Sequence, residues 1–221
     1  MALGTVAPQP ADAVPYKWGI GLSNTMTTKA SPDNETNGIV SFQNDAQKNE
    51  VVLQYKNGEK KYLKFYGPNI FRVFQDPQNG VVFRDPKANP EAQILVNNPM
   101  RPVGTINASE ANGNIVVKTS RISIAIRKAD GTMTVTDLQN GKTVMAETAP
   151  ASFDGGKVAM SLQAQPDEYF YGGGVQNGRF SHKGNTINIV NENSWTDGGV
   201  CSPAPYYWST NGYGFMAYTF K

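Results

Sequence analysis

Residues 114–138 read NIVVKTSRISIAIRKADGTMTVTDL, and the alternation of apolar and polar residues in this stretch decides the fold class. Every second residue from Ile122 to Ile126 is isoleucine, so the isoleucines share one face of an extended chain. This period of two is typical of a half-buried β-strand. NIVVKTS before it and TMTVTDL after it are further strands, and the turn ADG at 129–131 precedes the last one. Three strands this close together predict an antiparallel meander.

The same pattern recurs on both sides of the meander. Residues 49–55 and 60–67 read NEVVLQY and KKYLKFYG, and they are joined through Asn57 and Gly58. Both turn residues tolerate positive φ, which predicts a β-hairpin. Further strands are expected in NIFRVFQ, GVVFRD, TINIV, PYYWS and YGFMAYTF. No stretch of about 11 or more residues shows a clean 3.6-residue apolar period.

These patterns predict an all-β protein of roughly 10 to 14 strands with few or no helices, arranged as an antiparallel β-sandwich. A closed barrel is the alternative. No internal repeat and no linker are evident after residue 40, so residues 16–221 are predicted to form one domain. The first 15 residues are rich in Ala and Pro and are expected to form a poorly ordered leader.

The composition argues against several classes of function. A net charge of +2, from 20 basic and 18 acidic side chains, provides no basic surface of the kind that drives nucleic-acid binding. No apolar run approaches the roughly 20 residues of a membrane helix, so we expect no membrane partner. Cys201 is the only cysteine, which excludes an internal disulfide. No signal peptide is visible, and both a cytoplasmic and a secreted bacterial location stay open.

Residues 169–199 read YFYGGGVQNGRFSHKGNTINIVNENSWTDGG and admit three interpretations: a phosphate cradle, a sugar-binding edge and a plain set of turns. A phosphate loop needs the Lys and Ser/Thr of GxxxxGK[ST], and a dinucleotide fold needs a following helix; neither is present. The glycines therefore indicate backbone crowding or a bulge in a strand. His182 is the only histidine, so we expect an ordinary hydrogen bond at its ring, with no metal or other cofactor.

Paired carboxylates would indicate glycoside hydrolysis, but the late acids are scattered and predict no catalytic residue: Asp154, Asp167, Glu168, Glu192 and Asp197. The aromatic residues are more informative, because six lie within 21 positions: Trp195, Tyr206, Tyr207, Trp208, Tyr213 and Phe215. Aromatic faces beside polar groups suit sugars, which present apolar C–H faces and hydroxyl edges. Core packing is the more frequent role for Tyr207 and Phe215, whereas Trp195 stands in a polar loop.

The last quarter of the chain contains, in order, FYGGGVQNGRFSHKG, NENSWTDGG and PYYWSTNGYGFMAY. These segments resemble the N-terminal β-sandwich domain of glycoside hydrolase family 31, whose members share an aromatic–Tyr–Gly–x–Gly segment, a loop, and Pro-x-Tyr-x-Ser leading to Gly-Tyr-Gly-Phe. The resemblance covers about residues 40–221 and implies a galactose-mutarotase-like sandwich. Many members carry Gly-x-Gly-Glu where this chain has Val175 and Gln176, which is similar to a divergent branch of bacterial transglucosidases.

The resemblance implies a retaining enzyme that hydrolyses or transfers α-glucosyl units of α-glucans, using two aspartates of a (β/α)8 barrel that follows the domain. The barrel is absent from these 221 residues, so the chain is expected to be a fragment that is inactive alone. The implied partners are an α-glucan oligosaccharide and the protein's own barrel. The loop that covers the barrel mouth corresponds to about residues 191–203. The implied substrate-binding residues are Asp197, Trp195, Asn193 and Arg179.

Two other functions stay open on the residues alone. A free-standing carbohydrate-binding β-sandwich would use the same aromatic residues with no attached enzyme. A small secreted esterase would place His182 in a Ser–His–Asp triad, which a single histidine permits but does not establish.

Overall fold

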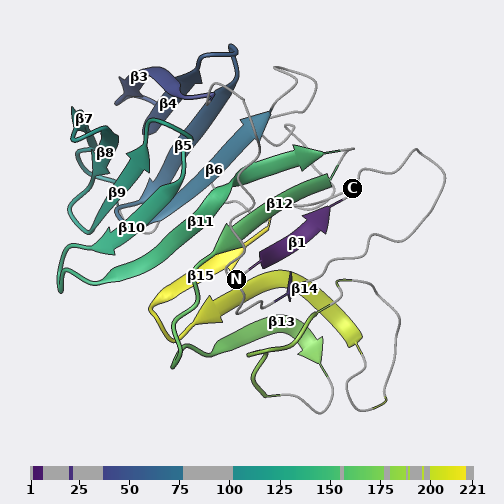
Figure 1. Cartoon of the computed structure of the whole chain (residues 1–221). Helices are drawn as coiled ribbons and strands as arrows, with labels where there is room; N and C mark the ends of the chain where they lie inside the picture. The colour runs from purple at the N-terminus through teal and green to yellow at the C-terminus, as the bar shows by residue number, and fades with distance from the viewer. Residues whose placement is uncertain are drawn as a thin grey trace. The chain divides into compact units, whose positions relative to one another are not determined.

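The computed structural model describes residues 2–6, 20–21, 37–76, 102–154, 157–176, 180–187, 189, 196 and 200–217. All regular structure in these residues is β-strand, and the strand pairs are antiparallel (Figure 1). The prediction of an all-β, antiparallel fold is therefore confirmed. No helix in the described ranges is long and apolar enough to cross a membrane.

The contacts between residues divide the chain into two compact units. The first, which we call the continuous unit, is Ser31–Thr143. The second, which we call the two-segment unit, combines Met1–Ala30 with Val144–Lys221. The strands and the buried residues are described unit by unit, as follows.

The continuous unit contains a four-stranded sheet and a four-stranded meander. The sheet has the order β3-β4-β5-β6 and consists of β3 (Ile39–Asp45), β4 (Glu50–Tyr55), β5 (Lys60–Gly67) and β6 (Ile70–Asp76). The meander consists of β7 (Asn107–Ala111), β8 (Asn114–Lys118), β9 (Ile122–Arg127) and β10 (Met133–Asp137). The predicted meander is β8 to β10, and the predicted hairpin is β4 and β5, where Gly58 has a φ of 90°.

Alternate residues of these strands build the core of the continuous unit. Leu53 on β4 and Leu63 on β5 are 0% exposed, as are Ile115 on β8 and Ile124 on β9. Fully burying one aliphatic side chain of this size contributes about 1.5–3 kcal/mol. The isoleucine face that the sequence predicts for β9 is thus the buried face.

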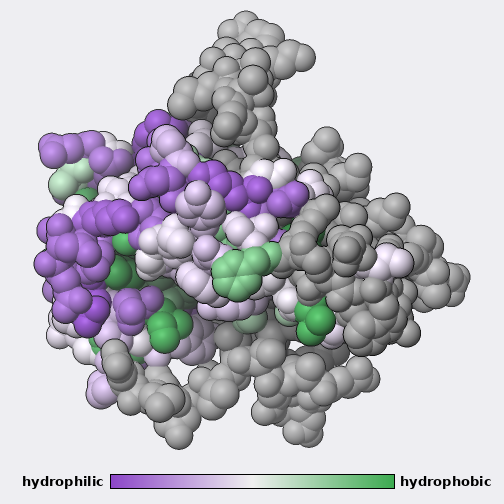
Figure 2. Space-filling model, turned by 90° about the horizontal axis from the view of Figure 1, so that it is seen from below, coloured by the Kyte–Doolittle hydropathy of each residue, from purple (hydrophilic) through white to green (hydrophobic). Residues whose placement is uncertain are grey.

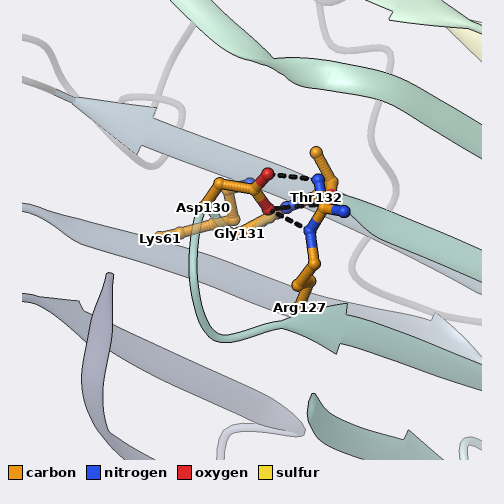
Figure 3. A network of polar contacts seen from close by, with 5 residues as sticks. All are labelled: Lys61, Arg127, Asp130, Gly131 and Thr132. Carbon is orange, nitrogen blue, oxygen red and sulfur yellow. Dashed lines mark hydrogen bonds and ion pairs between the residues drawn. The ribbon is translucent and has the colours of Figure 1, made fainter. Parts of the chain in front are cut away.

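A polar cluster at the turn between β9 and β10 joins the two layers of the continuous unit (Figure 3). Lys61 lies on the buried face of β5, is 2% exposed, and donates a 2.9 Å hydrogen bond to the Gly131 carbonyl. In the same turn, Asp130 accepts hydrogen bonds from Nε of Arg127 at 2.9 Å and from the backbone of Thr132 at 3.0 Å. Partial burial opposes ionisation of Asp130, but these hydrogen bonds outweigh it and lower the pKa of Asp130 below 3.8.

The two-segment unit contains two further groups of strands. One has the order β2-β1-β12-β11 and consists of β1 (Ala2–Val6), β2 (Ile20–Gly21), β11 (Thr143–Asp154) and β12 (Lys157–Leu162). The other has the order β13-β14-β15 and consists of β13 (Phe170–Gln176), β14 (Val200–Ser209) and β15 (Tyr213–Met216). Their shared core is a cluster of three buried residues, one each from β12, β13 and β14: Leu162, Phe170 and Tyr207.

Several expectations need correction or lie outside the described residues. Strand β1 (Ala2–Val6) lies within the segment expected to be a poorly ordered leader and pairs with β12, and the leader of residues 1–15 stays a prediction. The strand expected in TINIV is absent at Thr186, Ile187 and Ile189, and Ile187 packs against Gly173 of β13. The strand expected at 80–85 lies outside the described residues. A single domain over 16–221 stays a prediction.

Exposed hydrophobic side chains are concentrated in one part of the two-segment unit. On the face shown in Figure 2, hydrophilic side chains cover much of the described surface, and the hydrophobic ones lie in separate places. Among the described residues, six of the ten large exposed hydrophobic residues lie on β13 to β15 or next to these strands: Tyr169, Val175, Phe180, Tyr206, Trp208 and Met216. This three-stranded sheet is therefore the region to search for a binding function.

Candidate functional site

Strand β13 contains three consecutive glycines in a backbone conformation that only glycine adopts easily. The φ angles of Gly172, Gly173 and Gly174 are 113°, 75° and 79°, a region that L side chains rarely occupy. An added Cβ would lie 2.7 Å from the Tyr206 carbonyl oxygen at Gly172, and 2.2 Å from the Ser202 carbonyl oxygen at Gly174. The backbone of β14 therefore lies against this glycine run, and the register of the two strands shifts there. The predicted crowded, bulged strand is confirmed.

The other side of the glycine run is closed by the segment that follows β13. A Cβ on Gly173 would lie 2.7 Å from Cδ1 of Ile187. His182 is 5% exposed, and its Nε2 lies 2.8 Å from the carbonyl oxygen of Gly172. Because a carbonyl only accepts, Nε2 carries the proton and donates. In the described residues, β14 lies against one side of the run, and Ile187 and His182 lie against Gly173 on the other, which does not favour a phosphate cradle.

Further hydrogen bonds fix the start of the connection between β13 and β14. The backbone of His182 donates to the carbonyl of Phe170 at 2.8 Å. The Asn185 backbone donates to the carbonyl of His182 at 3.0 Å. Lys183 donates through its ammonium to the Pro166 carbonyl, and the same ammonium lies 4.5 Å from the centre of the Tyr169 ring. The base of this connection is thus held to β13 at several points.

His182 shows the ordinary hydrogen bond that the sequence suggests, and the geometry gives no support to a triad. Its Nε2 is occupied by Gly172, and its Nδ1 is buried with no partner among the described residues. The hydroxyl of Ser209 donates to Glu168, a carboxylate that is 2% exposed. No group of three or more His, Cys, Asp and Glu residues in the described part of the chain could hold a metal. Cys201 lies within β14.

The four residues predicted to bind substrate lie outside the described residues: Arg179, Asn193, Trp195 and Asp197. Their neighbour Thr196 is described and is exposed. The structure therefore shows the two strands from which this connection begins and ends, β13 and β14, and the four assignments stay predictions.

The aromatic residues of the sheet divide into an inner and an outer set. Tyr207 is 3% exposed and stacks on Phe215, with 5.7 Å between ring centres. Tyr213 contacts the edge of Tyr207 at 6.0 Å. Burial raises the pKa of Tyr207 and of Tyr213 above the usual range, so both phenols stay protonated. The core role predicted for Tyr207 is thus confirmed, and Phe215 packs with it.

The outer set consists of rings on the opposite face of the same strands. Tyr171 and Trp208 are paired across β13 and β14, and their rings stack at 4.5 Å with an angle of 26° between the planes. Phe180 contacts Tyr171 edge-on at 5.4 Å and is 87% exposed. Tyr206 and Trp208 are each 45% exposed. Because side chains alternate in direction along PYYWS, neighbouring aromatic residues fall into different sets. Their closeness in the sequence does not by itself show this division.

A family model describes the sheets that carry these features. Residues 60–220 match the glycosyl hydrolase 31 N-terminal galactose mutarotase-like domain. The chain belongs to this family. The resemblance of the three late segments and the galactose-mutarotase-like fold that it implies are confirmed.

Solved structures of GH31 enzymes share the fold at low sequence identity. A dextranase from Flavobacterium johnsoniae, complexed with isomaltotriose, has a TM-score of 0.69 and 16% identity. The cycloalternan-forming enzyme from Listeria monocytogenes, in complex with a pentasaccharide substrate, has a TM-score of 0.63 and 17% identity. An α-xylosidase from Xanthomonas citri has a TM-score of 0.51 and 23% identity. A comparison with curated protein sequences gives no match.

The alignments cover most of this GH31 domain and a small part of each enzyme. They include 82%, 90% and 73% of this chain, and 22%, 20% and 17% of the dextranase, the cycloalternan-forming enzyme and the α-xylosidase. The chain thus spans about a fifth of the length of these enzymes. It is a domain of the kind that GH31 enzymes carry at their N-terminus.

Proposed function

We propose that this chain is the N-terminal domain of a retaining GH31 enzyme that hydrolyses or transfers α-glucosyl units of α-glucans. The observation that carries the proposal is the family match over residues 60–220. The choice of α-glucans is supported by the shared fold with a dextranase complexed with isomaltotriose and with a cycloalternan-forming enzyme. The similar α-xylosidase makes α-xylosides the competing substrate class.

The domain's own contribution is a loop between β13 and β14 that reaches the substrate of the following barrel. The described part of the connection supports this role, because the glycine run and His182 fix its first turn. Within residues 191–203, Asp197 accepts a hydrogen bond from a sugar hydroxyl, and Asn193 and Trp195 adjoin the same sugar. Arg179, the fourth residue assigned to the substrate site, pairs with Asp197 or with the barrel. A charge-assisted hydrogen bond of this kind contributes about 1.5–3 kcal/mol.

Catalysis itself takes place on the barrel. In a retaining glycosidase, one carboxylate attacks the anomeric carbon while a carboxylic acid protonates the leaving oxygen, and water or an acceptor sugar then releases the glycosyl group. Both groups are aspartates of the barrel, so this domain supplies no catalytic residue. Its partners are the α-glucan oligosaccharide and that barrel, and the greater length of the similar enzymes supports the barrel's presence.

The test compares the 221-residue chain with the protein extended by its natural continuation. Glucose release from maltose, isomaltose, nigerose and panose is measured for both proteins, with an aryl α-xyloside as the competing substrate. We expect the extended protein to release glucose and the short chain to release none. Activity of the short chain would contradict the proposal, and release of xylose alone would change its substrate class.

A free-standing carbohydrate-binding domain is the second candidate. The exposure of Tyr206 and Trp208, each 45%, favours it, because soluble domains seldom expose neighbouring aromatic residues without a function. The two candidates differ in the continuation of the gene, where a series of alternating β-strands and helices with two aspartates supports the enzyme.

A further inference from the structure

The indole of Trp208 has one covered face and one open face. Tyr171 on β13 stacks on the covered face at 4.5 Å. In the order β13-β14-β15, the opposite side of Trp208 belongs to β15, where its paired residue is Gly214. Glycine has no side chain to place on the indole, and Tyr171 is the only ring contact of Trp208 in the described part of the chain. Trp208 is 45% exposed, so its open face is accessible.

A hydroxyl group lies beside this open face. Tyr206 precedes Trp208 by two residues and points to the same side of β14. Its hydroxyl oxygen lies 2.9 Å from the point where a Cβ on Gly214 would stand, so the phenol reaches across Gly214. No hydrogen bond of that hydroxyl is found among the described residues, and Tyr206 is 45% exposed. Within the described residues, the strands thus present an open indole face close to a hydroxyl that has no partner there.

Among the described residues, the outer face of β14 and β15 carries no charged side chain. The other described residues on the outer face of β14 and β15 are Ser202, Ala204 and Met216. An uncharged surface with one flat aromatic face and one donor–acceptor hydroxyl matches an uncharged ligand that has an apolar C–H face bordered by hydroxyls. Pyranose rings have this chemistry. A protein partner would also bury aromatic residues, but it would leave the Tyr206 hydroxyl in need of a buried partner.

We propose that Trp208, Tyr206 and Gly214 form an accessory binding site for α-glucan chains on the outer face of β13 to β15. One glucose ring lies on the open face of the Trp208 indole, and one of its hydroxyls bonds to the hydroxyl of Tyr206. Tyr171 holds the indole upright by stacking on its far face. The choice of an α-linked glucan rests on the proposed function.

Migration of the 221-residue chain in native gels that contain a polysaccharide tests the site. Dextran and glycogen provide α-linked glucose, and hydroxyethyl cellulose provides a β-linked control. We expect dextran or glycogen to retard the chain. Trp208→Ala should weaken binding by about 30-fold, as loss of a central aromatic contact does. Tyr206→Phe, which removes only the hydroxyl, should weaken it by about threefold to tenfold.

Two controls keep the result interpretable. Phe180→Ser removes an aromatic side chain that is 87% exposed and contacts Tyr171 away from the open indole face, so it should leave retardation unchanged. A thermal melt of each variant shows whether it is folded, and Tyr206→Phe retains the ring and its packing. The proposal would be overturned if an α-glucan retards the Trp208→Ala and Tyr206→Phe variants as strongly as the wild-type chain.

The outcome is independent of the enzyme assay. Absence of retardation by either α-glucan would overturn the accessory site even if the extended protein releases glucose. Retardation without glucose release by the extended protein would support the site and contradict the proposed function. A third outcome is that no α-glucan retards the short chain and that Trp208 is protected from oxidation only in the extended protein. This outcome would assign the face to a protein contact and overturn the glucan site.

Discussion

The continuous unit and the glycine run of the two-segment unit are both β-structure, but different physical effects specify them. In the continuous unit, alternate apolar side chains such as Leu63 and Ile124 are fully buried, and the strands follow from that alternation. In the glycine run, Gly172 and Gly174 are in place because β14 leaves no room for a Cβ. The burial of alternate apolar side chains specifies the continuous unit. The absence of side chains at the glycines specifies the glycine run. The predictions below test this difference.

The largest effect is expected at Gly174. Gly174→Val places a Cβ within 2.2 Å of the Ser202 carbonyl oxygen, in a backbone with a φ of 79°. The three atoms nearest to that Cβ, in Ser202, Pro203 and Ala204, all belong to the backbone, so the strands must separate. We expect a loss of about 4 kcal/mol or more in the free energy of unfolding. Urea unfolding measures it.

Gly184→Val is the matched control for that clash. Gly184 has a φ of 72° but has nothing within 4 Å of an added Cβ. Gly184→Val should therefore lower the free energy of unfolding only through the unfavourable backbone conformation, by about 1–2 kcal/mol. Equal losses at the two glycines would show that crowding by β14 does not specify the run.

The next largest effect is expected in the core of the continuous unit. Leu63→Ala removes a side chain that is 0% exposed and should cost about 2–5 kcal/mol in the free energy of unfolding. Val40→Ala, at a side chain that is 58% exposed, should change it by less than about 0.5 kcal/mol. A loss at Val40 as large as that at Leu63 would contradict the assignment of the buried face.

A smaller effect is expected at His182, which links the glycine run to the connection after it. His182→Ala removes the 2.8 Å hydrogen bond to the part-buried Gly172 carbonyl, so the loss in the free energy of unfolding should be about 1–3 kcal/mol. Thermal unfolding measures it. Hydrolysis of an aryl acetate by the wild-type chain that disappears in this variant would revive the esterase alternative and oppose the structural role.

The smallest effect is a pH dependence at Asp130. The pKa of Asp130 is lowered below 3.8 in the folded state. Its contribution to the free energy of unfolding is therefore complete above pH 3.8 and is lost as the pH falls through the lower folded pKa. Its carboxylate is 21% exposed and Arg127 is 57% exposed, so we expect less than about 1 kcal/mol. Unfolding of wild type and Asp130→Asn is compared from pH 7 to pH 2.5. The two curves should converge in acid, and a constant separation would contradict the assignment.

Sequence alternation predicts the fold where each strand buries one face. The meander around Ile124 and the hairpin at Gly58 are examples, and both were predicted. β7 was missed because NASEA has no apolar alternation and takes its place by pairing with β8. TINIV was predicted as a strand because its apolar residues alternate, but Ile187 packs against Gly173, a contact that only the folded chain creates.

The candidate site is less predictable than the fold. The glycines were correctly interpreted as a crowded strand, because no lysine or helix follows them. The separation of Tyr207 in the core from Trp208 at the surface follows from alternation once the strand is known. The open face of Trp208 depends on a glycine of β15 that stands opposite it, which no local pattern contains. The predicted substrate residue Asp197 lies outside the described residues and needs a direct test.

That test is the kinetics of the extended protein with panose, for wild type, Asp197→Ala and Asp167→Ala. Asp167 is an exposed acid in the turn before β13 and serves as the control. We expect Asp197→Ala to lower kcat/KM by about 10- to 100-fold, the loss of one charge-assisted hydrogen bond to the sugar, and Asp167→Ala to leave it unchanged. Equal kcat/KM for wild type and Asp197→Ala would contradict the claim that this domain lends a loop to the substrate site.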